Sequence, residues 1–134
     1  MDDIFVGSLM SSPVRTVTPD TSLRDAGEQM LADGIGSVIV VDGEGRLAGI
    51  LTSTDFVRIV AESGTDADAT VGDFMSTDVT TATANDSIRD VADMMVDHGF
   101  HHVPVVGGDD EVIGVITTTD LTAYVSTVQD PSPA

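Results

Sequence analysis

The chain has 134 residues, of which 41% are hydrophobic, so it is long enough for one compact domain or for two very small units that share a core. Its formal net charge of −18 comes from 23 acidic and 5 basic residues, and it excludes a surface built for the nucleic-acid backbone. The absence of cysteine excludes a disulfide framework and a thiolate metal site, and no apolar run approaches the roughly 20 residues of a membrane span.

The charge is also unusual in its distribution. The acidic residues are spread along the chain, all five bases are arginine, and aromatic residues make up 4%. This composition resembles that of proteins from extreme halophiles, the alternative being an acidic protein of a mesophile. The N-terminal sequence MDDIFVGSLM lacks the basic start of a signal peptide, so we expect a cytoplasmic protein.

The second half of the chain repeats the first half at an offset of 65 residues. Residues 6–56 align without a gap with residues 71–121, and 20 of these 51 positions are identical. The segments VGSLMSSPV, TSLRDAGEQM and ILTSTDF of the first copy correspond to VGDFMSTDV, DSIRDVADMM and VITTTDL of the second. An ungapped match of this length indicates an internal duplication.

Each copy predicts a short extended segment followed by a helix. The extended segments are Val14–Val17 and Val79–Thr81. Ser22 followed by Asp25 is typical of a capped helix start, and Gly34 and its counterpart Gly99 stand where the helices would end. Apolar residues recur between these points at helical spacing: Leu23, Ala26, Met30 and Leu31, then Ile88, Val91, Ala92 and Met95.

Two β-branched runs and a second helix follow in each copy. The strands are predicted at Ser37–Val41 and Leu47–Leu51 around the turn DGEG, and at Val103–Val106 and Val112–Ile116 around GGDD. After each Thr-x-Thr-Asp segment, apolar residues at helical spacing predict the second helix: Val57, Val60 and Ala61, then Leu121, Tyr124 and Val125.

These elements predict an α+β fold, sandwich-like, made of two β-α-β-β-α repeats. A two-stranded ribbon with two helices cannot close a core alone, so we expect the copies to pack through their sheets with pseudo-two-fold symmetry. The first repeat is predicted at residues 6–61, a polar linker (ESGTDADAT) at 62–70, and the second repeat at 71–128. We expect the end, QDPSPA, to fray.

The duplicated pattern resembles a known family, the cystathionine β-synthase-type (CBS) domain pair, or Bateman module. The resemblance rests on the VGxxM segments, the helix-ending glycines, the run HHVPVV, Gly49 and Gly114, and the Thr-x-Thr-Asp segments. It implies a regulatory, non-catalytic module that needs no cofactor and often pairs into flat dimers. It also implies that AMP, ADP, ATP, NAD or S-adenosylmethionine binds in clefts between the repeats.

Two clusters of hydroxyls and a carboxylate fall where a strand is predicted to lead into a helix. They are Thr52, Thr54 and Asp55 in the first copy and Thr117, Thr119 and Asp120 in the second. A helix N-terminus suits phosphate, and a carboxylate can accept from both hydroxyls of a ribose. The resemblance assigns the ribose to the aspartates and the phosphate to the threonines. The alternative is that Thr54 or Asp55, and likewise Thr119 or Asp120, merely caps its helix, although a cap needs one such residue and does not explain the paired threonines.

The histidines occur in the second copy alone. The resemblance implies that His101 and His102 contact phosphate, whereas the first copy has Gly36 and Ser37 at the matching positions. We therefore expect the two clefts to differ, with the second as the better phosphate site. Solvated histidines are one alternative. A metal site that includes His98 is another, although neighbouring residues on a strand point to opposite faces.

The remaining features favour a binding protein over an enzyme. The chain has no Ser/His/Asp set, Cys nucleophile, Walker loop or metal-ligand spacing, and nothing else in the sequence supports Asp55 and Asp120 as an acid–base pair. We expect Arg24 and Arg89 to be exposed charges, and Met30, Met94 and Met95 to fill the core. A ligand-sensing homodimer, whose apolar helix faces cover one another, is the leading hypothesis. The alternative is a ligand-free scaffold that acts through dimerisation or a protein partner.

Overall fold

The computed structural model describes residues 4–12, 14–62 and 68–128. Most of the predicted linker and the end QDPSPA therefore lie outside the described residues. The chain divides into two compact units. The first-repeat unit comprises Arg15–Val79 and Gly108–Val112, and the second-repeat unit comprises Met1–Val14, Thr80–Gly107 and Ile113–Ala134.

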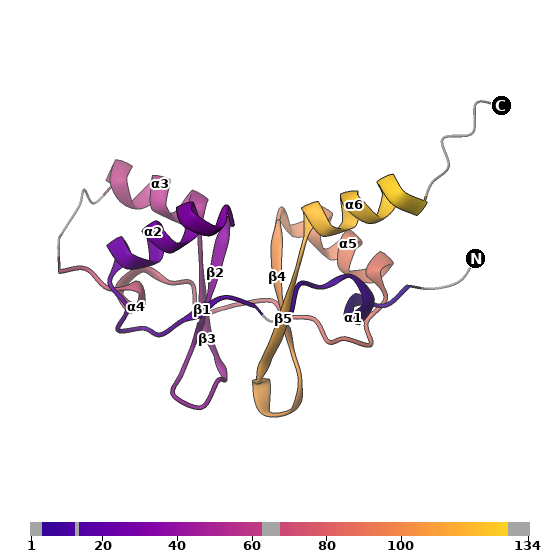
Figure 1. Ribbon diagram of the computed structural model, residues 1–134, viewed down its shortest axis with the longest axis horizontal. Coiled ribbons are helices and arrows are strands. Elements are labelled where there is room, and N and C mark those ends of the chain that lie inside the picture. Colours follow the sequence, from indigo (N-terminus) through magenta and orange to yellow (C-terminus); the bar gives the residue numbers. More distant parts are fainter. Residues whose placement is uncertain (1–3, 13, 63–67, 129–134) are drawn as a thin grey trace. The chain divides into compact units, whose positions relative to one another are not determined.

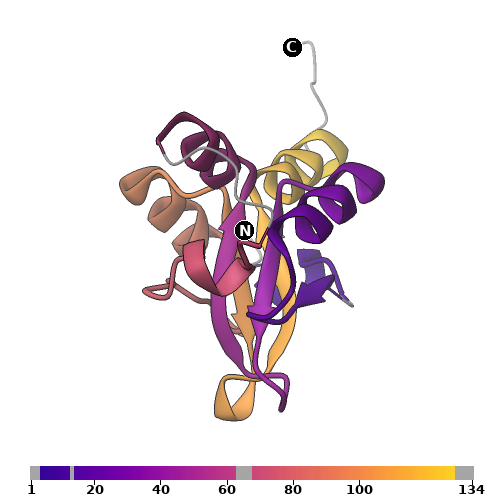
Figure 2. The same ribbon diagram turned by 90° about the vertical axis from the view of Figure 1, so that its left-hand side faces the viewer.

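The first-repeat unit is a three-stranded sheet covered by helices. Strand β1 (Thr16–Val17) runs parallel to β2 (Ser37–Val41), and β2 pairs antiparallel with β3 (Leu47–Thr52). Helix α2 (Leu23–Asp33) contacts β2 and helix α3 (Ser53–Glu62) contacts β3 (Figure 1). Figure 2 turns this unit toward the viewer, with the short helix α4 (Val71–Phe74) below α2 and α3. The core consists of Val17, Ala26, Met30, Val38, Val40, Leu51, Ile59 and Val71.

The second-repeat unit has the same order of elements around a two-stranded sheet. Strands β4 (His102–Val106) and β5 (Val112–Thr117) form the sheet, joined through a 3₁₀ turn at Gly108–Asp110. The helices are α1 (Val6–Leu9), α5 (Ile88–His98) and α6 (Thr118–Val128). Its core consists of Val6, Ala82, Val91, Met95, Val103, Val105 and Ile116. No helix in the described part of the chain is long and apolar enough to cross a membrane.

The long helices begin and end where the sequence predicts. The hydroxyl of Ser22 accepts the N–H of Asp25 at 3.0 Å, and Ser87 does the same for Asp90 at 3.1 Å. Gly34 and Gly99 end the two helices with φ of +64° and +71°, a left-handed conformation that glycine adopts without strain. Mixed helix and strand content in tandem repeats confirms the predicted α+β class, whereas packing of the two repeats through their sheets stays a prediction.

The VGxxM segment of each copy packs in the unit built on the other copy. In the first-repeat unit, the N–H of Gly72 donates to the carbonyl of Pro19 at 2.9 Å, and Ser76 pairs with Ile50. In the second-repeat unit, the N–H of Val6 donates to the carbonyl of Asp86 at 2.9 Å. We call residues 6–11 and 71–76 the leading segments. Because they are exchanged, each unit needs residues from both copies.

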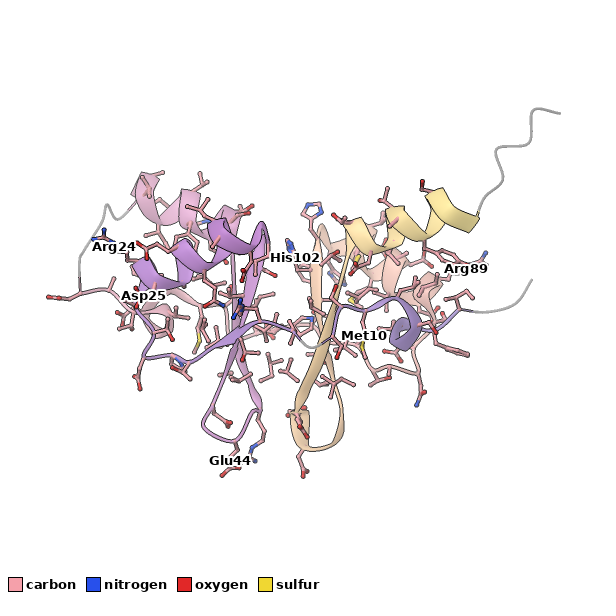
Figure 3. The ribbon with its side chains drawn as sticks, viewed as in Figure 1. Met10, Arg24, Asp25, Glu44, Arg89 and His102 are labelled. Atoms are coloured by element: carbon pink, nitrogen blue, oxygen red, sulfur yellow. The ribbon has the colours of Figure 1, made fainter. Side chains whose placement is uncertain are left out.

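The leading segments lie directly against the glycines of β3 and β5. A Cβ built on Gly49 would lie 2.8 Å from Sδ of Met75 and 2.7 Å from the carbonyl oxygen of Ser76. A Cβ on Gly114 would lie 2.7 Å from Sδ of Met10, the methionine labelled in Figure 3. These two positions therefore need a residue without a side chain, which explains the repeated glycine.

One predicted element differs between the two copies. The first extended segment forms β1, but residues 79–81 form no strand, and Ala82 makes a single parallel bridge to Val105. The strand expected to open the second repeat is thus a one-residue bridge at Ala82, which directly follows the predicted extended segment Val79–Thr81. Pro104 occupies the place of Ile39, which pairs with Thr16 in the first copy. Because proline has no N–H, it removes a donor from this edge of the sheet.

Candidate functional site

Each Thr-x-Thr-Asp segment lies at the junction where a strand turns directly into a helix. At the first junction, the N–H of Thr52 donates to Oδ2 of Asp55 at 2.8 Å, and the N–H of Asp55 donates to the hydroxyl of Thr52 at 3.2 Å. At the second junction, the matching bonds between Thr117 and Asp120 measure 2.9 Å and 3.1 Å. The structure thus brings each aspartate onto the threonine three residues before it, in a reciprocal cap.

The cap accounts for one threonine of each pair. Thr54 and Thr119 are exposed and have no hydrogen-bond partner within the part of the chain that the structure describes. The capping alternative is therefore correct for the aspartates, which work with Thr52 and Thr117. It gives no reason for a second hydroxyl beside each cap. Thr54 and Thr119 are thus available to a ligand.

The two capping aspartates differ in their second oxygen. Oδ1 of Asp55 accepts Nη1 of Arg58 at 3.1 Å, and the Asp55 side chain is only 15% exposed. Position 123, which corresponds to Arg58, is alanine, and Oδ1 of Asp120 has no protein donor among the described residues. The sequence alone does not single out Arg58, although its spacing of three residues after Asp55 on a predicted helix is a usable signal.

A backbone hydrogen bond connects each junction to the residue just before the first strand of the same hairpin, β2 or β4. The N–H of Ser53, the first residue of α3, donates to the carbonyl of Gly36 at 2.9 Å. The N–H of Thr118, the first residue of α6, donates to the carbonyl of His101 at 3.0 Å. The structure therefore places the backbone of His101 beside the second junction and the backbone of Gly36 beside the first.

The three histidines have different environments. His102, labelled in Figure 3, is half-buried; burial and the adjacent His101 lower its pKa, against the opposing effect of Asp120. His102 is therefore a neutral imidazole at pH 7. His98 stacks on Phe100 with ring centroids 5.4 Å apart. Across residues 4–12, 14–62 and 68–128, no three histidine, aspartate or glutamate side chains gather where they could hold a metal ion.

The other singled-out residues lie away from the junctions. Arg24 and Arg89 are exposed at the periphery of their units (Figure 3), and Arg24 pairs with Glu28 rather than with its neighbour Asp25. Met30 and Met95 are buried, and Met94 packs against the core. The predictions of exposed charges and of core methionines are confirmed.

Comparison with known proteins identifies the architecture. A sequence model of the CBS domain matches residues 6–62 and 71–127. An uncharacterized 17.7 kDa protein of Acidianus ambivalens is 30% identical over 132 residues, which cover 96% of this chain and 79% of that protein. In three further relatives, which are longer, the chain spans 41%, 23% and 62% of their length.

Solved structures agree with this match. The CBS domain pair of protein MJ0100, crystallised with 5'-methylthioadenosine and S-adenosyl-L-methionine, superposes with a TM-score of 0.88 at 26% identity. That match covers 96% of this chain and all of the other. CBSX2 in complex with AMP shares the fold, with a TM-score of 0.86 at 24% identity over 95% of this chain and 99% of that chain. Two tandem matches to the family model, two capped junctions and these neighbours lead to one conclusion: the chain belongs to the CBS domain family and carries a pair of its repeats.

Proposed function

We propose that this protein is a regulatory module that binds an adenosyl compound, such as AMP, ADP, ATP, NAD or S-adenosylmethionine, at its two strand-to-helix junctions. The observation that carries the proposal is the duplicated Thr–Asp cap, with a second threonine beside it that has no hydrogen-bond partner among the described residues. Structurally similar CBS pairs bind S-adenosyl-L-methionine, 5'-methylthioadenosine or AMP, which supports this ligand class.

The residues at each junction have distinct roles in this proposal. Asp55 and Asp120 hold the ribose, because a carboxylate oxygen has two acceptor sites and the cap uses only part of the capacity of each group. The hydroxyls of Thr52, Thr54, Thr117 and Thr119 donate to phosphate. Thr52 and Thr117 retain this ability, since a hydroxyl that accepts the cap bond still has its own proton to donate. His101 and His102 add phosphate contacts in the second-repeat unit.

The proposal assigns the protein no reaction and no required cofactor. Binding of the ligand instead changes its shape or its affinity for a protein that it regulates. We place this activity in the cytoplasm, where adenine nucleotides are abundant and a chain without cysteine needs no oxidising compartment.

The first test is mass spectrometry of small molecules released from protein purified in molar KCl. We expect an adenosyl compound that copurifies or, after its removal, rebinds in calorimetry. If no adenosyl compound is released and none binds, the ligand-sensing proposal is wrong. The scaffold that acts through dimerisation or a protein partner then takes its place.

We also propose that the module is a homodimer, paired through its helices. Leu31 is 85% exposed on α2, and its counterpart Val96 is 82% exposed on α5. Val60 on α3 and its counterpart Val125 on α6 are 60% and 54% exposed. Leu31 also borders an open apolar cavity of about 390 Å³ between α2 and α3. The same positions thus expose large apolar side chains in both repeats, and a second copy would cover them.

Light scattering in molar KCl tests the pairing. We expect a particle of twice the 13.9 kDa chain mass, and a monomer for Leu31→Glu. Ala32→Glu is the matched control, because it adds the same charge at an exposed position of the same helix. A wild-type particle of 13.9 kDa across micromolar concentrations would rule out the dimer.

A further inference from the structure

The two junctions differ in the kind of positive charge that they offer. At the first, the guanidinium of Arg58 is bonded to the capping aspartate. At the second, the corresponding position is Ala123, and the nearby candidates for positive charge are the imidazoles of His101 and His102. Arginine is charged at every physiological pH, whereas histidine titrates near neutrality.

Arg58 has N–H groups that its bond to Asp55 does not use. A guanidinium carries five N–H groups, and the structure assigns one of them, on Nη1, to Asp55 at 3.1 Å. The side chain is 58% exposed, so its remaining donors can reach a ligand. In the described part of the first-repeat unit, the other arginines pair with acids away from the junction: Arg15 with Asp33, Arg24 with Glu28, and Arg46 with Asp42 and Glu44.

The bond to Arg58 does not block the ribose. Each carboxylate oxygen accepts two hydrogen bonds, so Oδ1 of Asp55 can accept a ribose hydroxyl while Arg58 remains in place. The exposed guanidinium then has N–H groups left to donate to a phosphate on that ligand. The Asp55–Arg58 pair is also neutral as a unit, so it does not repel an anion. The charge of Asp120, by contrast, has no arginine beside it.

We propose that Arg58 is a specificity-determining residue, which makes the first junction selective for a phosphorylated adenosyl ligand. This inference rests on the proposed function and adds a discrimination between the junctions. At neutral pH the second junction, whose capping carboxylate has alanine at the position of Arg58, favours an adenosyl ligand without phosphate. At neutral pH, phosphate is therefore preferred at the first junction, whereas the histidines alone suggest a preference at the second.

Calorimetry of single junctions in molar KCl at pH 7.5 tests this assignment, with adenosine and AMP as probes. The Asp120→Asn variant reports the first junction, since asparagine keeps an oxygen for the cap and replaces the second oxygen with a donor. In this background we expect AMP to bind at least about tenfold more tightly than adenosine, the contribution of one charge-assisted hydrogen bond. Adding Arg58→Ala should abolish this preference and change the affinity for adenosine by less than about twofold.

Arg24→Ala in the same background is the matched control, because it removes an exposed arginine of the same unit that pairs with Glu28. It should leave both affinities unchanged. Arg58→Lys should keep part of the preference, since lysine retains the charge without the planar fork. In the Asp55→Asn variant, which reports the second junction, adenosine should bind at least as tightly as AMP.

Three results would overturn the inference. Unchanged AMP affinity after Arg58→Ala would show that the guanidinium does not contact phosphate. Equal weakening of AMP and adenosine would show that Arg58 only positions Asp55. Failure of the otherwise unaltered protein to bind these probes or any other adenosyl compound would instead reject the proposed function itself, and the role of Arg58 with it.

Discussion

Asp55 and Asp120 each serve the fold with one carboxylate oxygen and leave the other oxygen for a second purpose. Replacing a capping residue with alanine costs about 0.5–2 kcal/mol of stability, so Asp55→Ala would weaken the helix as well as any ligand site. Asparagine separates the two effects, because its amide oxygen can still accept the N–H of Thr52. Binding tests at these junctions therefore depend on aspartate-to-asparagine variants.

His102 makes the stability of the protein depend on pH. Its pKa in the folded protein is lowered, chiefly by burial, whereas a histidine in an unfolded chain titrates near 6.5. Between these two values the unfolded chain binds more protons, so this contribution to stability is present above about pH 6.5 and is lost as the pH falls below it. Urea denaturation in molar KCl should show lower stability at pH 5.5 than at pH 7.5, and His102→Gln should reduce the difference.

His98→Gln is the control for this experiment, because His98 is exposed and stacks on Phe100. An equal reduction in both variants would show that the pH dependence does not arise at His102. The groups that act on His102 are His101, the residue just before β4, and Asp120, in the first turn of α6.

His102 should also make phosphate binding at the second junction depend on pH. A phosphate favours protonated His102, so the affinity for AMP should rise as the pH falls below about 6.5. His102→Ala should remove this dependence, as measured by calorimetry in the Asp55→Asn background. Affinity for AMP that is independent of pH in both proteins would contradict a phosphate contact by His102.

At the scale of elements, the exchanged leading segments connect the two repeats. Gly49→Ala would force a Cβ against Met75 and the backbone of Ser76, so we expect it to lower the free energy of unfolding by about 1–3 kcal/mol. Gly114→Ala should lower the free energy of unfolding by a similar amount, because its Cβ would lie against Met10. Gly43→Ala is the control, since no atom lies within 4 Å of its Cβ position. Urea denaturation in molar KCl with equal stability for Gly49→Ala and Gly43→Ala would contradict this packing.

Most elements could be predicted from local sequence patterns. Strand β2 has the predicted bounds Ser37–Val41, and β3 extends one residue beyond its prediction, to Thr52. The caps at Ser22 and Gly34 depend on neighbouring residues alone, which is why they were predictable. The short helices α1 and α4 and their exchange between units depend on contacts across the chain, which no local pattern contains.

Part of the site was also predictable, because it is formed by residues that are close together in the chain. The repeated motif located the junctions and both aspartates, and a cap is a local feature. The sequence did not show that Thr52 and Thr117, rather than Thr54 and Thr119, share the cap with the aspartates. It also did not show that Arg58 reaches back to Asp55, because the rotamer of a long side chain follows from its surroundings.

The net charge of the whole molecule makes its stability depend on the salt concentration. A net charge of −18 on 134 residues creates repulsion that salt screens, and the Debye length falls from about 10 Å at 0.1 M to about 3 Å at 1 M. We therefore expect the protein to unfold in dilute buffer and to be stable in molar KCl. Circular dichroism melts at several KCl concentrations measure this effect. Equal melting temperatures at low and high KCl would contradict it.

Binding of an adenosyl ligand at the duplicated junctions can be measured on the whole protein. The most direct measurement is calorimetric titration of AMP in molar KCl into the wild type and into the Asp55→Asn, Asp120→Asn double variant, with folding of both verified by circular dichroism. We expect saturable binding to the wild type that is lost in the folded double variant. Binding of equal strength to both proteins, or no heat with the wild type for AMP or any other adenosyl compound, would contradict it.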